Sequence, residues 1–401
     1  MSIKRLFLRY LIVKKMIIGY EAKRVFQNCS GLGNYSRNTI SLLARYYPEN
    51  RYKLFAPKLT DLYSMPRSAQ IITPKTFFSK LMTSYWRLRQ VDKILKYNNI
   101  EVFHGLSHVL PFGVEKTGIP SVVTVHDLIF LRYPEYYKFI DRKMYESIYK
   151  SSCIRATKII AISNQTKVDL IHFFGIHPDK IEVIYQSCNK VFYDKVGGAQ
   201  KTAIRLKFNL PEKFILSVGT IERRKNQLAI LKAVVKEKLD ITVVILGKPT
   251  EYMNQLNHFI NEAGISKQVL FLHNTTTDEL KAIYQMAEVM VYPSFFEGFG
   301  LPVLEAQASG CAVITSNISS LPEAGGKGAL YVNPEDISEI GYSINSLLSD
   351  IQLKSKLIQK GTANAALFSE KLVAERLMRL YMKLTQKSIP IITFKPMPVT
   401  I

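Results

Sequence analysis

The chain has 401 residues, 47% of them hydrophobic, which is enough to bury the cores of two ordinary domains. Its formal net charge is +22, and its four cysteines show neither Cys-x-x-Cys nor zinc spacing, which favours a reduced compartment. No apolar run is long enough for a membrane span, and the first fifteen residues lack the cleavage pattern of a secretory signal.

The positive charge is concentrated in one half of the chain. Residues 1–190 hold 30 Lys/Arg against 13 Asp/Glu, a net charge of +17, whereas residues 191–401 hold 24 against 19, a net charge of +5. Such a basic half could bind nucleic acid, an anionic membrane or a diphosphate-bearing substrate. Because zinc-finger spacing and an RNA-recognition signature are both absent, we expect no nucleic-acid partner and favour an anionic membrane surface.

The first predicted strand begins at residues 15–19, and Met16 could be an alternative start of the compact domain. The basic, apolar residues before it are either a membrane-touching arm or a tail without function. A Gly-x-Gly segment follows, with Gly31 and Gly33, and then a helix that runs to Ala44. A Gly-x-Gly loop between strand and helix lets the backbone approach a ligand closely, although a plain turn would explain it equally well.

Two later strands of the first half end in a histidine, His104 and His126. A lone histidine at a strand end is usually structural. His126 differs because it ends a continuous β-branched run, and open parallel sheets place ligands at the carboxyl ends of their strands. The next residue, Asp127, either contacts an acceptor or caps the chain locally, and the only tryptophan, Trp86, is expected in the core. Strands are predicted at 101–103, 121–125, 158–162 and 180–185.

The second half follows a predicted linker at residues 186–202 and alternates strands with helices. Asn226 and Thr277 are plausible helix N-caps. Strands of the buried type that alternate with helices predict a parallel sheet covered on both faces. The strands are predicted at 214–218, 241–246, 269–272, 289–292 and 312–315.

A glycine turn with adjacent cations follows the first strand of the second half. Residues Gly219 to Asn226 read Gly-Thr-Ile-Glu-Arg-Arg-Lys-Asn. The turn and the predicted helix start would place backbone donors, a bidentate guanidinium and an ammonium in one place. An isolated charge run would be solvated surface, but beside a second phosphate-binding element it would form a diphosphate clamp.

The second element is the stretch Tyr292 to Glu305, which reads Tyr-Pro-Ser-Phe-Phe-Glu-Gly-Phe-Gly-Leu-Pro-Val-Leu-Glu. It follows a strand, contains a glycine loop and opens a helix with Pro302 as first residue. Glu297 is predicted in the loop and Glu305 in the first helical turn, where free N–H groups suit phosphate. A carboxylate there can accept hydrogen bonds from a ribose diol. Two solvated glutamates are the alternative, but the coincidence of strand, glycines, proline and helix favours a binding site.

These motifs resemble the nucleotide-sugar signature of glycosyltransferase family 4, the retaining enzymes of the GT-B fold. The resemblance covers roughly residues 16–385 and includes a Leu-Pro-Glu-Ala-Gly segment after the donor loop. It implies an α/β architecture of two facing Rossmann-like domains with parallel sheets and a C-terminal helix that crosses back to the first domain. The implied domains are residues 1–190 on the acceptor side, with 1–15 as an arm, residues 191–369 for the nucleotide sugar, and residues 370–401 for the crossing helix and a tail.

The resemblance also implies roles. Glu305 holds the ribose, Glu297 contacts the donor sugar, and Arg224 and Lys225 neutralise the diphosphate. His126 meets the sugar from the other domain, with Asp127 on the acceptor side. Where many members carry an arginine after the glycine, this chain has threonine, as in a branch that includes bacterial mannosyltransferases. This departure leaves either Arg223 or Arg224 to supply the guanidinium. The remaining donor-binding positions are Gly31, Gly33, Gly219, Thr220, Gly298, Phe299, Gly300 and Leu301.

The sequence contains no Asp-x-Asp, so we expect no metal and no cofactor, with leaving-group charge neutralised by Arg224, Lys225 and backbone amines. Retention, by resemblance, implies same-face attack with the departing phosphate as base. We expect a hexosyltransferase, with mannose from GDP-mannose favoured, that builds O-antigen, capsule or exopolysaccharide on a glycan or lipid-linked acceptor. Its expected place is the cytoplasmic face of the plasma membrane. The alternatives are a nucleotide-sugar epimerase of the same architecture and a non-catalytic basic protein that binds membrane or nucleic acid.

Overall fold

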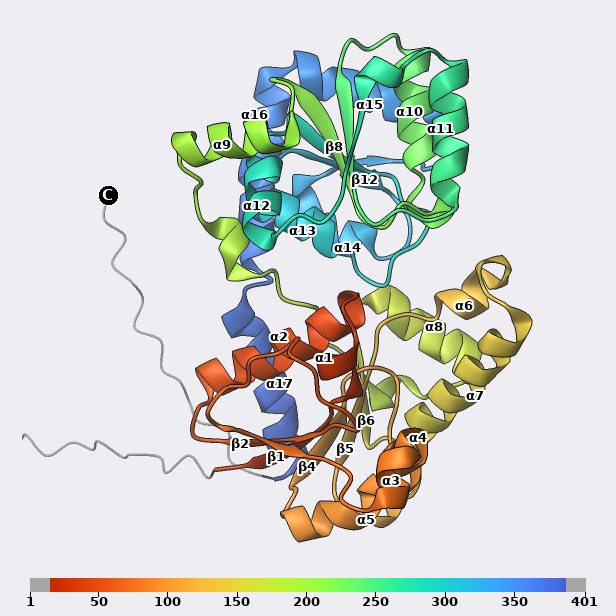
Figure 1. Ribbon diagram of the computed structural model, residues 1–401, viewed down its shortest axis with the longest axis vertical. Coiled ribbons are helices and arrows are strands. Elements are labelled where there is room, and N and C mark those ends of the chain that lie inside the picture. The colour runs from red at the N-terminus through yellow and green to blue at the C-terminus, as the bar shows by residue number, and fades with distance from the viewer. Residues whose placement is uncertain (1–14, 387–401) are drawn as a thin grey trace, which may run out of the picture. The chain divides into compact units, whose positions relative to one another are not determined.

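The computed structural model describes residues 15–386 and contains two parallel β-sheets (Figure 1). These residues divide into two compact units. The first unit holds the residues up to Thr124, residues 151–159 and the residues from Ala374 onward, and the second holds residues 125–150 and 160–373. The predicted arm before Lys15 and the predicted tail at 388–401 lie outside the described residues. The predicted α/β class with two parallel sheets is confirmed.

The first sheet has seven strands in the order β3-β2-β1-β4-β5-β6-β7. Every side chain of β5 is buried, as its continuous β-branched run predicts. The strands of the first sheet are β1 (Ile17–Glu21), β2 (Arg51–Phe55), β3 (Ala69–Ile72), β4 (Val102–Gly105), β5 (Ser121–Val125), β6 (Lys158–Ala161) and β7 (Ile181–Val183). The helices between them are α1 (Lys23–Gln27), α2 (Gly31–Tyr46), α3 (Phe77–Leu81), α4 (Thr83–Arg89), α5 (Val91–Leu95), α6 (Ile129–Arg132), α7 (Phe139–Arg155) and α8 (Asn164–Phe174).

The second sheet has six strands in the order β10-β9-β8-β11-β12-β13, so that the strand order reverses between β8 and β11. Ligands of open α/β sheets bind at such a reversal. Its strands are β8 (Phe214–Val218), β9 (Thr242–Leu246), β10 (Val269–Leu272), β11 (Val289–Tyr292), β12 (Val313–Ser316) and β13 (Leu330–Val332). Its helices are α9 (Gly198–Phe208), α10 (Gln227–Lys236), α11 (Tyr252–Glu262), α12 (Thr277–Met286), α13 (Leu301–Ala308), α14 (Leu321–Gly325), α15 (Ile337–Ser349) and α16 (Ile351–Ala366).

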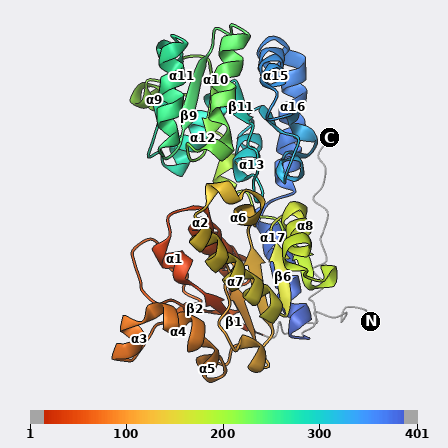
Figure 2. The same ribbon diagram turned by 90° about the vertical axis from the view of Figure 1, so that its right-hand side faces the viewer.

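Helices cover the two faces of the second sheet (Figure 1 and Figure 2). Alternate side chains of its strands pack against them. Leu216 of β8 and Met290 of β11 belong to the core that includes residues of α12 and α13. Ile215 and Val289 belong to the core that includes residues of α10 and α15. Each fully buried side chain of this size contributes roughly 1.5–3 kcal/mol, so both helical layers hold the sheet in place. The predicted coverage on both faces is confirmed.

The predicted glycine loop between the first strand and its helix is wrong. Helix α2 begins at Gly31, so Gly31 and Gly33 both lie in its first turn. The side-chain oxygen of Asn28 accepts a hydrogen bond from the Gly33 backbone N–H at 3.0 Å. A Cβ at Gly33 would lie 1.9 Å from the Asn28 carbonyl oxygen, so only glycine fits there. The motif therefore packs a helix start against Asn28.

Of the two predicted helix N-caps, Asn226 is confirmed as the N-cap residue of α10, whereas the cap of α12 differs. Asn226 has a φ of 59° and makes no cap hydrogen bond with its side chain. Its amide nitrogen instead donates to the carbonyl oxygens of Pro293 at 3.2 Å and Pro334 at 2.7 Å, which ties three loops together. The N-cap of α12 is Thr276, which forms a capping box, and the predicted cap Thr277 is the first residue of the helix.

The last described helix is α17 (Glu370–Leu384), which confirms the helix predicted at 370–383. Its residues from Ala374 onward belong to the first unit. There the hydroxyl of Tyr381 lies 2.6 Å from Nδ1 of His104, and both side chains are buried. Between residues 15 and 386, no helix combines the length and the apolar character that a membrane crossing requires.

Candidate functional site

The two charged motifs of the sequence meet at the strand reversal of the second sheet. Strands β8 and β11 are neighbours, and the segments Gly219–Asn226 and Pro293–Gly300 follow their carboxyl ends. The Phe295 backbone N–H donates to the Arg224 carbonyl oxygen at 2.9 Å, which joins the two loops directly. This edge of the sheet is therefore the candidate site.

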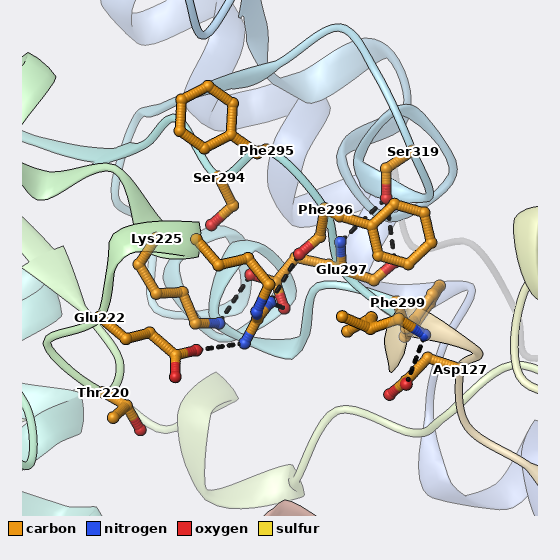
Figure 3. Close-up of polar contacts among 12 residues, drawn as sticks. Asp127, Thr220, Glu222, Lys225, Ser294, Phe295, Phe296, Glu297, Phe299 and Ser319 are labelled. Atoms are coloured by element: carbon orange, nitrogen blue, oxygen red, sulfur yellow. Dashed lines mark hydrogen bonds and ion pairs between the residues drawn. The ribbon is translucent and has the colours of Figure 1, made fainter. Parts of the chain in front are cut away.

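Glu297 is the centre of a buried ion-pair cluster (Figure 3). Its Oε1 accepts from Lys225 Nζ at 2.6 Å and from the Tyr292 hydroxyl at 3.0 Å. Its Oε2 lies 2.9 Å from Nη1 of Arg224. Arg224 also donates to the Phe296 carbonyl oxygen at 2.6 Å. Glu297 was predicted to contact the donor sugar, from a loop that faces the cations. In the structure it is the direct ion-pair partner of both cations.

A second carboxylate, that of Glu222, pairs with Nη2 of Arg224. The sequence did not single out this residue. Of the two carboxylates that pair with Arg224, Glu222 is the more exposed, and Glu297 is buried. With Glu222, Arg224, Lys225 and Glu297 all ionised, the four charges sum to zero. An incoming diphosphate would therefore compete with these carboxylates for the two cations.

The ion pairs fix the protonation states of the cluster. Burial by itself would raise the pKa of Glu297, but the charges of Arg224 and Lys225 lower it to about 2. Burial lowers the pKa of Lys225, and the Glu297 carboxylate opposes that effect. Burial would also lower the pKa of Arg224, but the charges of Glu297 and Glu222 raise it. The glutamate therefore stays ionised throughout the physiological range.

The loop that carries Glu297 is held by two serines that the sequence did not indicate. The Glu297 backbone N–H donates to Ser319 Oγ at 2.9 Å, and that hydroxyl lies 2.9 Å from the Glu297 carbonyl oxygen (Figure 3). Ser320 Oγ donates to the carbonyl oxygens of Glu297 and Phe299, both at 2.8 Å. These contacts come from the segment after β12, which lies more than twenty residues further along the chain.

Two glycines of the loop are required by its path. Gly300 has a φ of 123°, a backbone conformation that residues with a Cβ rarely adopt, and it is the N-cap of α13. A Cβ at Gly298 would lie 2.4 Å from the His126 carbonyl oxygen. The loop thus passes directly over the segment that follows β5. Phe299 points into the core, where its ring stacks on Tyr185 at 5.3 Å between centroids, so only its backbone borders the loop surface.

Helix α13 begins at Leu301, one residue before the predicted start, and Pro302 is its second residue. Glu305 is therefore the fifth helical residue and lies in the second turn, so its predicted place in the first turn is wrong. Its Oε2 accepts a hydrogen bond from the Tyr284 hydroxyl at 3.3 Å. Burial raises the pKa of Glu305 to about 7, which the single hydrogen bond from Tyr284 opposes only in part. Near neutral pH this carboxyl is poised between its two forms.

The remaining predicted residues take up several positions. His126 is buried, and its carbonyl oxygen accepts from Thr166 Oγ1 at 3.1 Å. Asp127 Oδ1 accepts from the Ile129 backbone N–H at 3.2 Å, so the local capping contact is present. Burial raises the pKa of Asp127, and the charge of Arg224 opposes this. The carbonyl oxygen of Thr220 accepts from Gln227 at 3.1 Å.

Gly31 and Gly33 belong to the first unit, whereas the ion-pair cluster belongs to the second. In the described part of the chain, no group of three or more His, Cys, Asp or Glu side chains is arranged to hold a metal ion.

Comparison with known proteins places this geometry in a family. Residues 31–189 match the family model described as Glycosyltransferase Family 4, and residues 200–364 match the model described as Glycosyl transferases group 1. The two matches together take in most of the chain. Two α/β units with a cation cluster after the first strand of the second sheet define a glycosyltransferase of the GT-B fold. The chain belongs to glycosyltransferase family 4, which decides against the epimerase and the non-catalytic alternatives.

The chain is similar to several bacterial enzymes. The O-antigen chain mannosyltransferase RfbU of Salmonella typhimurium is 31% identical over 63% of this chain and 66% of its own length. O-antigen chain mannosyltransferase B of Escherichia coli is 27% identical over 67% of this chain and 70% of its own length. The match to the serotype-specific mannosyltransferase WbdA of Escherichia coli covers only 37% of that protein. The chain therefore matches two thirds or less of the length of several of these relatives.

Solved structures share the fold at low identity. A glycosyltransferase from Rickettsia africae gives a TM-score of 0.74 at 18% identity, with 94% of this chain and 100% of that chain covered. The Anabaena protein HepE, solved with UDP and glucose, gives a TM-score of 0.72 at 15% identity over 92% of this chain and 100% of its own. At such identities the likeness shows the fold alone.

Proposed function

We propose that this enzyme transfers a hexosyl residue, with mannose favoured, from a nucleoside-diphosphate sugar to a glycan or lipid-linked acceptor, with retention, during synthesis of a surface polysaccharide. The observation that carries the proposal is the buried cluster of Arg224, Lys225 and Glu297 beside the start of α13. The O-antigen mannosyltransferases among the relatives support mannose and polysaccharide synthesis. The Anabaena structure with UDP-glucose supports a nucleotide-sugar donor, and GDP is proposed here with the mannose.

The diphosphate would bind to the two cations and to the first turn of α13. Arg224 offers a bidentate guanidinium, and Lys225 offers a point charge. In the first turn of α13, Pro302 has no N–H and the Val303 N–H donates to the Gly300 carbonyl oxygen at 3.0 Å, so the backbone N–H of Leu301 is the one that we propose for the anion. As the bond to the sugar breaks, these groups neutralise the charge that develops on the leaving phosphate oxygen. We propose that this happens without a metal ion and without a cofactor.

The four charges of the cluster sum to zero, which implies that ion-pair partners are exchanged when the donor binds. Glu297 is buried and its loop is anchored by two serines, so it would keep its contacts. Glu222 is the more exposed partner of Arg224, and we propose that the phosphate displaces it. Glu297 would then orient the cations and border the sugar, while Glu305 would accept hydrogen bonds from the ribose hydroxyls. Same-face attack by the acceptor, with the departing phosphate as base, completes the proposed reaction.

The enzyme would act at the inner face of the plasma membrane as a peripheral protein. The support is the net charge of +17 in residues 1–190, which suits an anionic lipid surface. A lipid-linked acceptor is presented at such a surface.

The test of the donor is a screen of the full chain against GDP-mannose, UDP-glucose, UDP-galactose and UDP-N-acetylglucosamine, with released nucleoside diphosphate as the readout. We expect turnover with GDP-mannose to exceed that with the UDP sugars. Arg224→Ala should abolish it, and Lys356→Ala, an exposed lysine of α16, is the matched control. Turnover restricted to a UDP sugar would contradict the proposed donor, and no turnover with any donor would contradict the proposed reaction. The anomeric configuration of the product, measured by NMR, tests retention.

A further inference from the structure

The helix pair α3 and α4 of the first unit exposes large apolar side chains. Phe77 is 85% exposed and Leu81 is 73% exposed, and Phe78, Met82 and Tyr85 beside them are also exposed. In Figure 1 and Figure 2 these two helices lie beside α5. Single exposed apolar residues are ordinary, but a contiguous group marks a surface that contacts another phase or molecule. We call these five residues the α3–α4 apolar surface.

Helix α3 buries a polar residue and exposes apolar residues, which is the reverse of an ordinary surface helix. Its polar residue Ser79 is buried, and its hydroxyl donates to Gln90 Oε1 at 2.8 Å. The Thr76 side chain caps the helix by accepting from the Ser79 backbone N–H at 3.2 Å. The two aromatic residues between them point outward. A water-facing helix buries its apolar stripe, so these contacts hold α3 in an arrangement suited to an apolar medium.

The residues around this surface are basic. Residues 69–100 contain six cations and a single acid, Asp92. Such an excess of cations complements an anionic surface and does not suit a zwitterionic one. Five of these cations are exposed, whereas Arg87 is largely buried and pairs with Glu21; the exposed ones are Lys75, Lys80, Arg89, Lys93 and Lys96.

A cavity of 460 Å³ opens between β3 and helices α3 to α5. Its lining includes Trp86, Ile94 and Tyr97, together with Lys75 and Lys93. Apolar walls with two cations suit a molecule that has an apolar chain and an anionic head. The sequence assigned Trp86 to the core, and its ring is indeed buried, but it also borders this cavity.

We propose that the α3–α4 apolar surface docks on an anionic phospholipid bilayer. The apolar side chains enter the interface, the surrounding lysines and arginines bind lipid phosphates, and one lipid chain enters the cavity beside Trp86. This surface lies in the first unit, so the proposal is independent of the donor cluster and of the glycosyl transfer proposed above. It names the contact that would hold the enzyme at the membrane.

The first test is co-sedimentation of the full chain with phosphatidylglycerol-containing vesicles and with pure phosphatidylcholine vesicles. The surface variant is Phe77→Ser/Phe78→Ser/Leu81→Ser. The matched control is Leu206→Ser/Tyr342→Ser/Ile351→Ser in the second unit, where Tyr342 is 71% exposed and Ile351 is 77% exposed. All six side chains are exposed, so both variants should retain the fold, which circular dichroism checks.

We expect wild type and control to bind the anionic vesicles, and the partition coefficient of the surface variant to fall by roughly tenfold or more. Equal binding of the two triple variants would overturn the proposal. An absence of wild-type binding to the anionic vesicles would also overturn it. In that case, loss of self-association or of binding to another protein in the surface variant would indicate a protein partner for this surface. Because vesicle binding requires no glycosyl transfer, its failure is distinguishable from failure of the proposed reaction.

The second test uses Trp86 as an internal probe, because the chain contains only one tryptophan. Anionic vesicles whose lipids carry bromine on the acyl chains should quench its fluorescence, and the same vesicles without bromine should not. The control triple variant should be quenched like the wild type. Unquenched fluorescence of vesicle-bound enzyme would overturn entry of a lipid chain into the cavity.

Discussion

The carboxylate of Glu297 and the ammonium of Lys225 form a buried ion pair, with 2.6 Å between Oε1 and Nζ. Burial disfavours the charged form of both groups, and each group opposes that effect on the pKa of the other; the charge of Arg224 lowers the pKa of Glu297 further. The glutamate thus favours the charged form of the lysine, which is the form that the proposed diphosphate donor would contact.

Glu297→Ala should destabilise the second unit as well as slow turnover. Removal of one partner of a buried ion pair leaves an uncompensated charge, which costs roughly 3–5 kcal/mol. Urea unfolding measures the loss. The companion variant Glu297→Ala/Lys225→Met removes both charges and should recover part of that stability but not the activity. If both the unfolding free energy and the turnover of Glu297→Ala matched those of wild type, the role assigned to this pair would be wrong.

The same pair makes acid stability sensitive to Glu297. Its pKa is lowered from 4.5 in the unfolded chain to about 2 in the folded one. A lowered pKa adds stability that is complete above about 4.5 and is lost as the pH falls towards about 2. Unfolding curves between pH 5 and pH 2.5 should therefore converge for wild type and Glu297→Gln. A constant difference across that range would contradict the assignment.

Donor affinity should rise with pH through neutrality because of Glu305. Its pKa is raised to about 7, and only the ionised form gives ribose a charge-assisted acceptor, worth roughly 1.5–3 kcal/mol. Calorimetric binding of GDP at pH 6 and pH 8, in buffers of different ionisation enthalpy, should show tighter binding at pH 8 and proton release on binding near pH 7. Glu305→Gln should bind weakly at both values. A pH-independent wild-type affinity would rule out the ribose role.

Glu222→Gln should bind a nucleoside diphosphate more tightly than the wild type does. Glu222 competes with phosphate for Arg224, so its neutralisation should lower the Kd by a factor of up to about five, which corresponds to the roughly 1 kcal/mol of one surface-type ion pair. Isothermal titration with GDP gives the comparison. Glu262→Gln, an exposed glutamate of α11, is the control and should behave as wild type. A weaker complex for Glu222→Gln would show that this carboxylate helps to bind the donor.

Turnover should survive chelation with EDTA, since Arg224, Lys225 and the α13 backbone are proposed to carry the charge of the leaving group. The measurement is product formation before and after EDTA, with magnesium or manganese added back. Activity that disappears with EDTA and returns with either ion would refute a metal-free reaction.

Much of the second unit could be predicted from the sequence because its signals are local. Strand β8 is a continuous apolar run, and the cations of the segment after it are adjacent in the chain. The contacts that anchor the donor loop are not local. Ser319 and Ser320 reach Glu297 from more than twenty residues away, and nothing in their own neighbourhood marks them.

The errors in the first half have similar causes. Strands β2 and β3 were not predicted: β2 mixes cations with apolar residues, and β3 is only partly buried. The Gly-x-Gly segment was predicted as a loop because glycine favours turns, yet the close contact of Gly33 with Asn28 requires glycine inside a helix. In the second half, the start of α13 at Leu301 follows from the fold of the loop before it, so Glu305 lies in the second turn of the helix and not in the first.

The assignment of α17 to the first unit from Ala374 onward has a consequence for synthesis of the protein. A ribosome releases residues 15–124 long before it releases Tyr381, whose hydroxyl contacts the buried His104. The first unit therefore cannot complete its core until the end of the chain emerges, although the whole second sheet can form earlier. The order of folding in the cell is thus expected to be the reverse of the order of the two sheets in the sequence.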